Sequence, residues 1–492
     1  MNPLRKLAGQ TAIYGLSSIV PRFLNYFLVP LHTYIFTDPS TYGIVGDLYS
    51  WVVILLIVLT YGMETAFFRF SQNEKDANKV YSTSLISLIT SSSLFIILAI
   101  LFSQSIANLL DYPNNPEYIR WCAIILGVDA ICAIPFVKLR QQNKALKFAS
   151  FKLFNVIINV TFTIIFLVVF PWIDAHITHL PSFIYSSKIG IGYIFIANII
   201  ASITTMVMLY KDFKFSLSFD IELWKRMLKY ALPLLLAGLA GGINDAIDRQ
   251  FIKYMIPDAN NPMHQLGVYF AIVKIAVILT VFVQTFRFAA EPFFFNYEKE
   301  KDSKQVFADI MKYFAVFCFI IFIATVGNIS WIKYFIHNTY WSGLNIVPII
   351  LLANVFVGIY LNLSIWYKLS GKTMYGAYII IFGSAITVLI NYLFVSKYGY
   401  LASAYARLIC YVAMTIVCYW LGQKYYRIPY NLKSIFWYFL LSLIVLIPVF
   451  FLKNSQIIVQ FIVNNLILLL FILYILKREK LLPVLVGYLR KK

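Results

Sequence analysis

Long apolar segments separated by short polar stretches recur along the whole chain. Fourteen of them are long enough to cross a bilayer, because a spanning helix needs about 20 mostly apolar residues. They cover residues 9–35, 44–68, 81–103, 118–137, 149–171, 188–210, 229–256, 266–294, 308–328, 345–367, 373–396, 400–421, 434–452 and 456–476. The loops between them are short and leave no room for a soluble domain. The pattern therefore predicts fourteen transmembrane helices.

The composition agrees with a membrane environment. The chain is 61% hydrophobic and only 13% charged, whereas ordinary globular domains are about 25% charged. No soluble fold can bury this much apolar surface. Helices satisfy their own backbone hydrogen bonds inside hydrocarbon, so they are the expected elements. The fold class predicted is an all-α integral membrane protein.

A net charge of +20 is compatible with a nucleic-acid partner, but the placement of the basic residues argues against one. If the N-terminus is inside, most of the 41 lysines and arginines fall in the loops on that side and in the C-terminal tail. The opposite side holds only Arg120, Lys188, Lys253, Lys333, Lys397 and Lys453. This asymmetry is the positive-inside rule, and it places both termini in the cytoplasm.

The seventh and eighth apolar segments are similar to the first and second. Gly15-Leu16 aligns with Gly238-Leu239, and Tyr42-Gly43-Ile44 aligns with Leu266-Gly267-Val268, with a slip of one residue between the two matches. We expect two six-helix halves, residues 1–215 and 216–425, related as a parallel repeat around a central cavity. Transporters built in this way place their substrate between the halves. Residues 426–492 then supply helices 13 and 14 and a basic tail.

Several charges lie inside the apolar segments of the second half. Asp245, Asp248 and Arg249 fall in the seventh segment, and Lys274 and Arg287 fall in the eighth. Each such charge costs about 2.5 kcal/mol or more on insertion scales, and intramembrane charges usually mark a polar pathway. Arg249 and Lys274 both lie roughly 10–12 Å from the outer end of their helices at 1.5 Å per residue.

Two interpretations of these charges remain open. Arg249, Lys274 and Arg287 can face a cavity and bind an anionic substrate. Alternatively, Asp245–Arg249 and Arg287–Glu291 neutralise each other locally, because residues at i and i+4 share one face of a helix. Lys274 has no such local partner in the sequence, which favours the cavity for this residue.

Further polar candidates lie elsewhere in the chain. Arg22 and Asn25 occupy the first segment, with Arg22 near mid-membrane, and Arg407 lies in the twelfth. Each is a candidate for substrate binding, with a structural role as the alternative. Glu64, Asp129 and Asp245 are candidates for binding a coupling cation or proton, or for accepting structural hydrogen bonds.

The chain has no motif for catalysis, metal binding or nucleotide binding. HExxH, GxSxG and Walker sequences are absent. The five cysteines lie in apolar segments without the paired spacing of a metal site. We therefore expect no enzymatic activity, no metal and no cofactor, and energy supplied by an ion gradient or the membrane potential.

Two stretches carry a family resemblance. FLVPLHTYIFTDPSTYGIVGDLYSWVVILL, followed by YGMETAFFRF, resembles the opening of bacterial polysaccharide transporters. IDRQFIKYMI, followed by LGVYFAIVKIAVIL, resembles the second-half signature of that family. The family belongs to the multidrug/oligosaccharidyl-lipid/polysaccharide exporter (MOP) superfamily.

The resemblance implies a flippase for undecaprenyl-pyrophosphate-linked oligosaccharide in the bacterial inner membrane, acting in O-antigen (lipopolysaccharide) or capsule synthesis. Its implied partners are the lipid-linked oligosaccharide, membrane lipids and polysaccharide polymerase machinery. By position and residue type, Arg22, Arg249 and Lys274 would meet the pyrophosphate. The alternatives are a lipid II flippase, a multidrug cation antiporter, and a membrane-embedded polymerase or glycosyltransferase, for which the external loops are too short.

Overall fold

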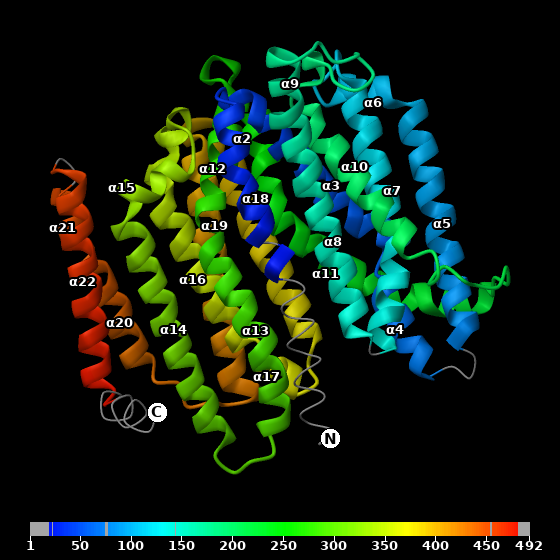
Figure 1. The fold of residues 1–492 in the computed structure, drawn as a ribbon. Helices are drawn as coiled ribbons and strands as arrows, with labels where there is room; N and C mark the ends of the chain where they lie inside the picture. Colours follow the sequence, from blue (N-terminus) through cyan, green and yellow to red (C-terminus); the bar gives the residue numbers. More distant parts are fainter. Residues whose placement is uncertain (1–18, 22, 74–76, 143, 453–454, 481–492) are drawn as a thin grey trace, which may run out of the picture. The chain divides into compact units, whose positions relative to one another are not determined.

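The computed structural model describes residues 19–21, 23–73, 77–142, 144–452 and 455–480, and every regular element in these ranges is helical (Figure 1). The elements up to residue 208 are α2 (Leu28–Ile35), α3 (Pro39–Thr60), α4 (Met63–Asn73), α5 (Ala77–Leu101), α6 (Ser103–Leu109), α7 (Pro116–Gln141), α8 (Ala145–Ile164), η1 (Ile165–Val169), α9 (Phe170–His176), η2 (Ser187–Ile189) and α10 (Gly192–Met208). Those that follow are α11 (Ile221–Met255), η3 (Asp258–Asn260), α12 (Pro262–Ile275), α13 (Val277–Tyr297), α14 (Ser303–Gly327), α15 (Ile329–Ile332), η4 (Lys333–Phe335), η5 (Asn338–Ile346), α16 (Val347–Leu363), α17 (Ile365–Leu369), α18 (Met374–Tyr398), α19 (Tyr400–Tyr425), α20 (Leu432–Val445), α21 (Ile447–Phe451) and α22 (Ile457–Arg478).

The prediction of a multi-pass membrane protein is confirmed. Among the described residues, 12 helices are long and apolar enough to cross a membrane. A further apolar helix, Gly192–Met208, is shorter, and the first predicted segment lies partly outside the described ranges, which lack residues 9–18 and 22 of it. The count of fourteen spans therefore stays a prediction.

By contacts between backbones, the chain forms two compact units. The first unit comprises Met1–Gly267 and Val388–Gly399, and the second comprises Val268–Thr387 and Tyr400–Lys492. Helix α11 belongs to the first unit in this division. The six-helix halves expected from the sequence repeat remain a prediction.

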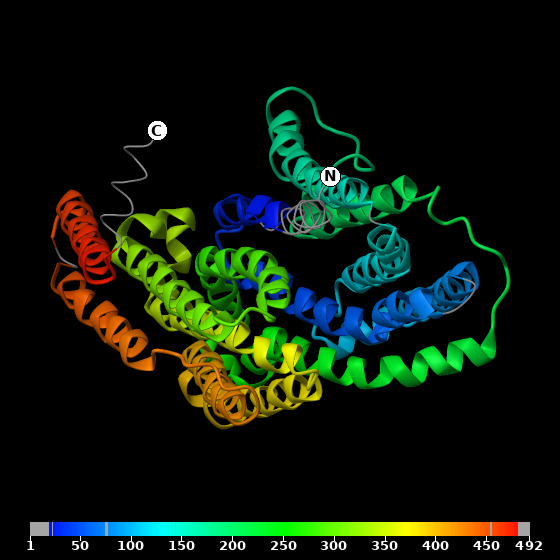
Figure 2. The same cartoon turned by 90° about the horizontal axis from the view of Figure 1, so that it is seen from below.

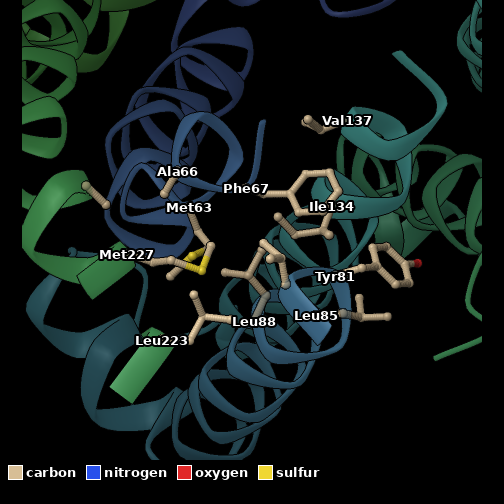
Figure 3. Packing of buried hydrophobic residues seen from close by; sticks show 12 residues of the cluster. Met63, Ala66, Phe67, Tyr81, Leu85, Leu88, Ile134, Val137, Leu223 and Met227 are labelled. Carbon is tan, nitrogen blue, oxygen red and sulfur yellow. The ribbon is translucent and has the colours of Figure 1, made fainter. Parts of the chain in front are cut away.

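A buried apolar cluster holds four helices of the first unit together. Met63 and Phe67 of α4 pack with Leu85 and Leu88 of α5 (Figure 3). The remaining members come from the same two helices and from α7 and α11: Ala66, Val80, Tyr81, Ile134, Val137, Leu223, Met227 and Ala231. The first turns of α11 are thereby fixed to α4, α5 and α7.

Two glycines allow α3 and α12 to approach closely within the first unit. A Cβ on Gly267 would lie 1.8 Å from the carbonyl oxygen of Pro39, and a Cβ on Gly43 would lie 2.6 Å from the carbonyl oxygen of Met263. These obstacles are backbone atoms, which cannot rotate away as a side chain can. Gly43 and Gly267 are also the residues that the sequence repeat aligns with each other.

Substituting Gly267 by alanine is expected to lower the free energy of unfolding by about 1–3 kcal/mol, because overpacking forces the backbones apart. The measurement is chemical denaturation of the purified protein in mixed detergent micelles. Gly241→Ala is the matched control, since a Cβ at Gly241 meets nothing within 4 Å. Equal stability of the two variants would contradict the close packing.

In the second unit, α14 is the helix against which α16, α20 and α22 pack; Figures 1 and 2 show α20 and α22 beside it. Polar contacts fix α22 at its C-terminal end and within its first half. Lys312 Nζ of α14 lies 2.5 Å from Glu479 Oε2, and Tyr438 of α20 donates to Glu479 Oε1 at 2.6 Å. In the first half of α22, Asn464 donates to the carbonyl of Gly327. The two last helices are thus anchored to α14 by hydrogen bonds as well as by apolar contact.

Candidate functional site

The first unit contains a cavity of ≈ 240 Å³ among α3, α4, α7, α8 and α10. We call it the inner cavity. Its polar lining consists of Thr60, Glu64, Asp129, Arg140, Lys152, Asn155 and Thr205, and the other lining residues are apolar or Cys132. Ionisable residues within spanning helices are energetically costly, and they usually mark a functional pathway.

The inner cavity brings together two of the acids that the sequence marked separately. Glu64 comes from α4 and Asp129 comes from α7, and both side chains are partly buried. Asp129 Oδ1 accepts a hydrogen bond from Ser202 Oγ of α10 at 2.8 Å. Both carboxylates therefore line the same cavity.

Basic residues line the same cavity. Arg140 of α7 and Lys152 of α8 are both exposed, and Lys152 Nζ lies 4.2 Å from the ring centroid of Phe136. Two carboxylates and two cations therefore line the same cavity. The described residues contain no group of three or more His, Cys, Asp or Glu side chains that could hold a metal ion.

A second polar cluster in the first unit is fully buried and was not found from the sequence. Lys253 Nζ, in the last turn of α11, lies 2.7 Å from Asp47 Oδ2 of α3, with side-chain exposures of 4% and 0%. Lys253 also donates to the carbonyl of Leu110 at 2.6 Å, and Gln250 donates to Asp47 Oδ1 at 2.7 Å. The charge pattern counts Lys253 among the basic residues of the outer side and does not predict this buried ion pair.

Tyr112 completes this cluster. Its hydroxyl donates to Asp47 Oδ2 at 2.7 Å, and its ring lies 4.3 Å from Lys253 Nζ. Burial and the neighbouring Asp47 carboxylate raise the pKa of Tyr112, so the phenol stays a neutral donor. Asp47 thus accepts from three side chains, as a buried carboxylate requires. The cluster joins α3, α11 and the turn before α7.

In the second unit, Arg287 lies beside an ion pair. Glu291 of α13 pairs with Lys368 of α17, and both line a small pocket of ≈ 10 Å³ with Arg287. Asn362 of α16 lines it too, and its buried Nδ2 has no hydrogen-bond partner among the described residues. The i,i+4 spacing predicts that Glu291 pairs with Arg287. This prediction is wrong, because Glu291 pairs with Lys368 of another helix. The pocket presents more donors than acceptors.

Comparison with known proteins decides the family. The family profile described as "Polysaccharide biosynthesis protein" matches residues 7–298. The chain belongs to this polysaccharide biosynthesis family. No curated protein sequence matches the chain significantly.

Solved structures share the fold. The lipid II flippase MurJ in an inward closed conformation has a TM-score of 0.73 at 16% identity, covering 94% of this chain and 99% of that one. A multidrug resistance MATE family transporter of the MOP superfamily, in an inward-facing conformation, has a TM-score of 0.57 at 13% identity, covering 83% and 93%. A MATE structure in complex with MaD3S has a TM-score of 0.59 at 14% identity, covering 85% and 94%. At these identities the likeness concerns the fold.

Three other candidates of this polysaccharide biosynthesis chain lie on α11 and α12. Arg249 is partly buried in α11, and its backbone N–H donates to the carboxylate of Asp248 at 2.9 Å. Asp245 is exposed on the same helix. Lys274 is partly buried in α12, with its Nζ 4.8 Å from the ring centroid of Phe270. The roles expected for these residues remain predictions.

Three further candidates for substrate binding are Asn25, Arg407 and Arg22. Asn25 is exposed, in the helical residues before α2, and Arg407 is partly buried in α19. Arg22 lies outside the described residues. Their roles in substrate binding also remain predictions.

Sequence reasoning missed Asp47, Lys253 and Lys368. Asp47 is a lone carboxylate in an apolar segment, and that signal could have marked it as needing a buried partner. Lys253 and Lys368 each stand at the end of an apolar segment, where a lysine usually extends to the interface. Their partners lie on other helices and are invisible in local spacing.

Proposed function

We propose that this protein is a flippase that moves undecaprenyl-pyrophosphate-linked oligosaccharide, an O-antigen or capsule repeat unit, across the bacterial inner membrane. The observation that carries the proposal is the family match over residues 7–298. The fold shared with MurJ and with MATE transporters supports an alternating-access mechanism, in which a cavity opens first to one side and then to the other. In this proposal the protein moves the substrate without changing its covalent structure.

The intramembrane cations support a pyrophosphate substrate. A pyrophosphate crossing hydrocarbon needs its charge compensated throughout, and basic side chains supply charge-assisted hydrogen bonds. Arg249, Lys274, Arg287 and Arg407 are basic residues within helices, and all are partly buried. With Arg22 and Asn25 they form the proposed substrate-binding set. The lipid tail remains in the membrane while the head group passes.

The glycine contact supports the proposed repeat. Gly43 and Gly267 are aligned by the sequence repeat and approach each other reciprocally: a Cβ on either residue would come within about 3.3 Å of the other's backbone nitrogen. Reciprocal contact of equivalent positions is expected near a two-fold axis. We propose that residues 1–215 and 216–425 are the repeated halves, with 426–492 appended.

Orientation and partners follow from the charge pattern and the family. We propose an inner-membrane location with both termini in the cytoplasm, where the basic loops meet anionic lipid. The product would be delivered to polysaccharide polymerase machinery on the far side.

The inner cavity is the proposed coupling site, with Asp129 and Glu64 as the groups that bind the driving proton or cation; Asp245 is a third candidate outside this cavity. Asp129→Asn is expected to reduce the response of transport to an imposed ion gradient about tenfold or more in membrane vesicles. A side chain positioned for proton transfer contributes at least this much to the rate of the step that it serves. Asp258→Asn, at an exposed outer residue of η3, is the matched control. An unchanged gradient response in Asp129→Asn would remove this residue from the mechanism.

Removal of the gene from its host tests the substrate class. Lipid-linked oligosaccharide should accumulate, and surface polysaccharide should disappear, while cell-wall synthesis and drug sensitivity stay normal. Arrest of cell-wall synthesis would indicate the alternative of a lipid II flippase, the function named for MurJ, which shares this fold. Increased drug sensitivity with normal surface polysaccharide would indicate a multidrug antiporter.

A further inference from the structure

The first unit has an open groove of ≈ 580 Å³ between α5 and α11, which we call the lateral groove. We propose that it binds an anionic phospholipid of the cytoplasmic leaflet. The groove is lined by Tyr61, Ile86, Ser87, Thr90, Ser91, Leu94, Phe219, Trp224 and Leu228. The proposal does not depend on which substrate the protein transports.

The walls of the lateral groove suit a hydrocarbon chain. Leu94 of α5 is 55% exposed, and Phe219, just before α11, is 43% exposed. Helices α5 and α11 are long and apolar enough to cross a membrane. Ile86, Thr90 and Leu94 recur every fourth residue along α5, so they form one continuous stripe. A concave apolar stripe along a spanning helix holds an acyl chain at a fixed place.

The polar groups in the floor satisfy one another. Trp224 Nε1 donates to Ser87 Oγ at 2.8 Å, and the Tyr61 hydroxyl lies 2.5 Å from the same Ser87 oxygen. The indole is therefore held by a hydrogen bond and forms a rigid wall of the groove. Its ring lies against the space that the chain of a lipid would occupy.

The segment that leads into α11 is held by polar contacts at the end of the lateral groove where α11 begins. This segment passes around the first turns of α5 (Figure 2), where Asp220 N donates to Thr83 Oγ1 at 3.3 Å. Asp220 Oδ2 lies 2.7 Å from Lys79 Nζ, and Asp220 Oδ1 accepts from the N–H groups of Glu222 and Leu223. The bond from Leu223 N–H and the Lys79 ammonium lower the pKa of Asp220, so this carboxylate stays charged and already paired.

The charge left at this end of the groove is positive. Lys225 directly follows Trp224 on α11, and Lys225, Arg226 and Lys229 are all exposed, against the single exposed acid Glu222. Basic clusters beside membrane helices on the cytoplasmic side bind anionic lipid head groups. The chain of the lipid would lie along α5, and its phosphate would meet Lys225.

Quenching of Trp224 by brominated lipids tests the site. The protein has 9 tryptophans, so the difference between wild type and Trp224→Phe isolates the signal of this one. In nanodiscs, brominated phosphatidylglycerol should quench Trp224 at a lower mole fraction than brominated phosphatidylcholine. Lys225→Gln should weaken this preference about fivefold, the share of one lysine at an anionic surface.

Two further variants keep the outcome clear. Lys433→Gln, at an exposed lysine in the first turn of α20, should leave the preference unchanged. Thr90→Phe, at an exposed position of the groove, should reduce quenching by both lipids. Equal quenching by the two lipids, or no effect of Lys225→Gln, would overturn the proposal. Displacement of the quencher by undecaprenyl phosphate more readily than by phosphatidylglycerol would also overturn it. Flipping activity is measured separately, so its loss or retention does not decide this test.

Discussion

Replacing Lys253 by methionine is expected to lower the free energy of unfolding by about 3–5 kcal/mol, because removing one member of a buried ion pair strands the other charge. Asp47 would remain fully buried, with only the neutral donors Tyr112 and Gln250. Methionine nearly preserves the length of the apolar part of lysine, so the loss reports on the charge. Chemical denaturation in mixed micelles gives the value.

Lys397→Met is the matched control for this prediction. Lys397 also lies in the last turn of a spanning helix, α18, but it is exposed. The double variant Asp47→Leu with Lys253→Met should recover part of the lost stability, because replacing both charges is often neutral. Recovery stays partial, since Tyr112 and Gln250 lose their acceptor. A Lys253→Met protein as stable as Lys397→Met would contradict the buried pair.

The second large effect concerns transport. Arg249→Ala and Lys274→Ala are each expected to reduce export of surface polysaccharide about 10- to 100-fold while protein levels stay near normal. Loss of one charge-assisted hydrogen bond to a phosphate is worth about 1.5–3 kcal/mol, and each 1.4 kcal/mol is tenfold. The measurement is surface polysaccharide in a deletion strain carrying each variant, with protein quantified in the membrane fraction.

Lys433→Ala serves as the control for these variants, because this exposed lysine lies outside the apolar part of its helix. Conservative variants sharpen the test. Arg249→Lys should retain part of the activity, since charge remains but the bidentate fork is lost. Normal export by both alanine variants would end the idea that these cations carry the pyrophosphate.

The helical membrane class was readable from the sequence because it depends on local properties. Apolar runs of about 20 residues and the sidedness of basic loops are fixed by the bilayer itself. The positions of Glu64 and Asp129 in spanning helices were also readable. Their meeting in one cavity was not, because it depends on how α4 packs against α7.

Charge pairing was the part that local spacing could not supply. An i,i+4 acid and base on one helix look like partners, yet Glu291 pairs with Lys368 of another helix. Lys253 stands at the end of an apolar run and resembles an interfacial anchor, yet Asp47 draws it into the interior. In both cases the deciding interaction links residues far apart in the chain, and only tertiary packing selects it.

Reconstitution tests the central claim most directly. Purified protein is placed in liposomes containing undecaprenyl-pyrophosphate-linked oligosaccharide with a labelled sugar, and the label's accessibility to a membrane-impermeant glycosidase is followed over time. We expect protein-dependent translocation of the oligosaccharide, with Arg249→Ala reduced about 10- to 100-fold and Lys433→Ala unchanged. Translocation no faster than in protein-free liposomes, with folded protein and an imposed ion gradient, would contradict the account.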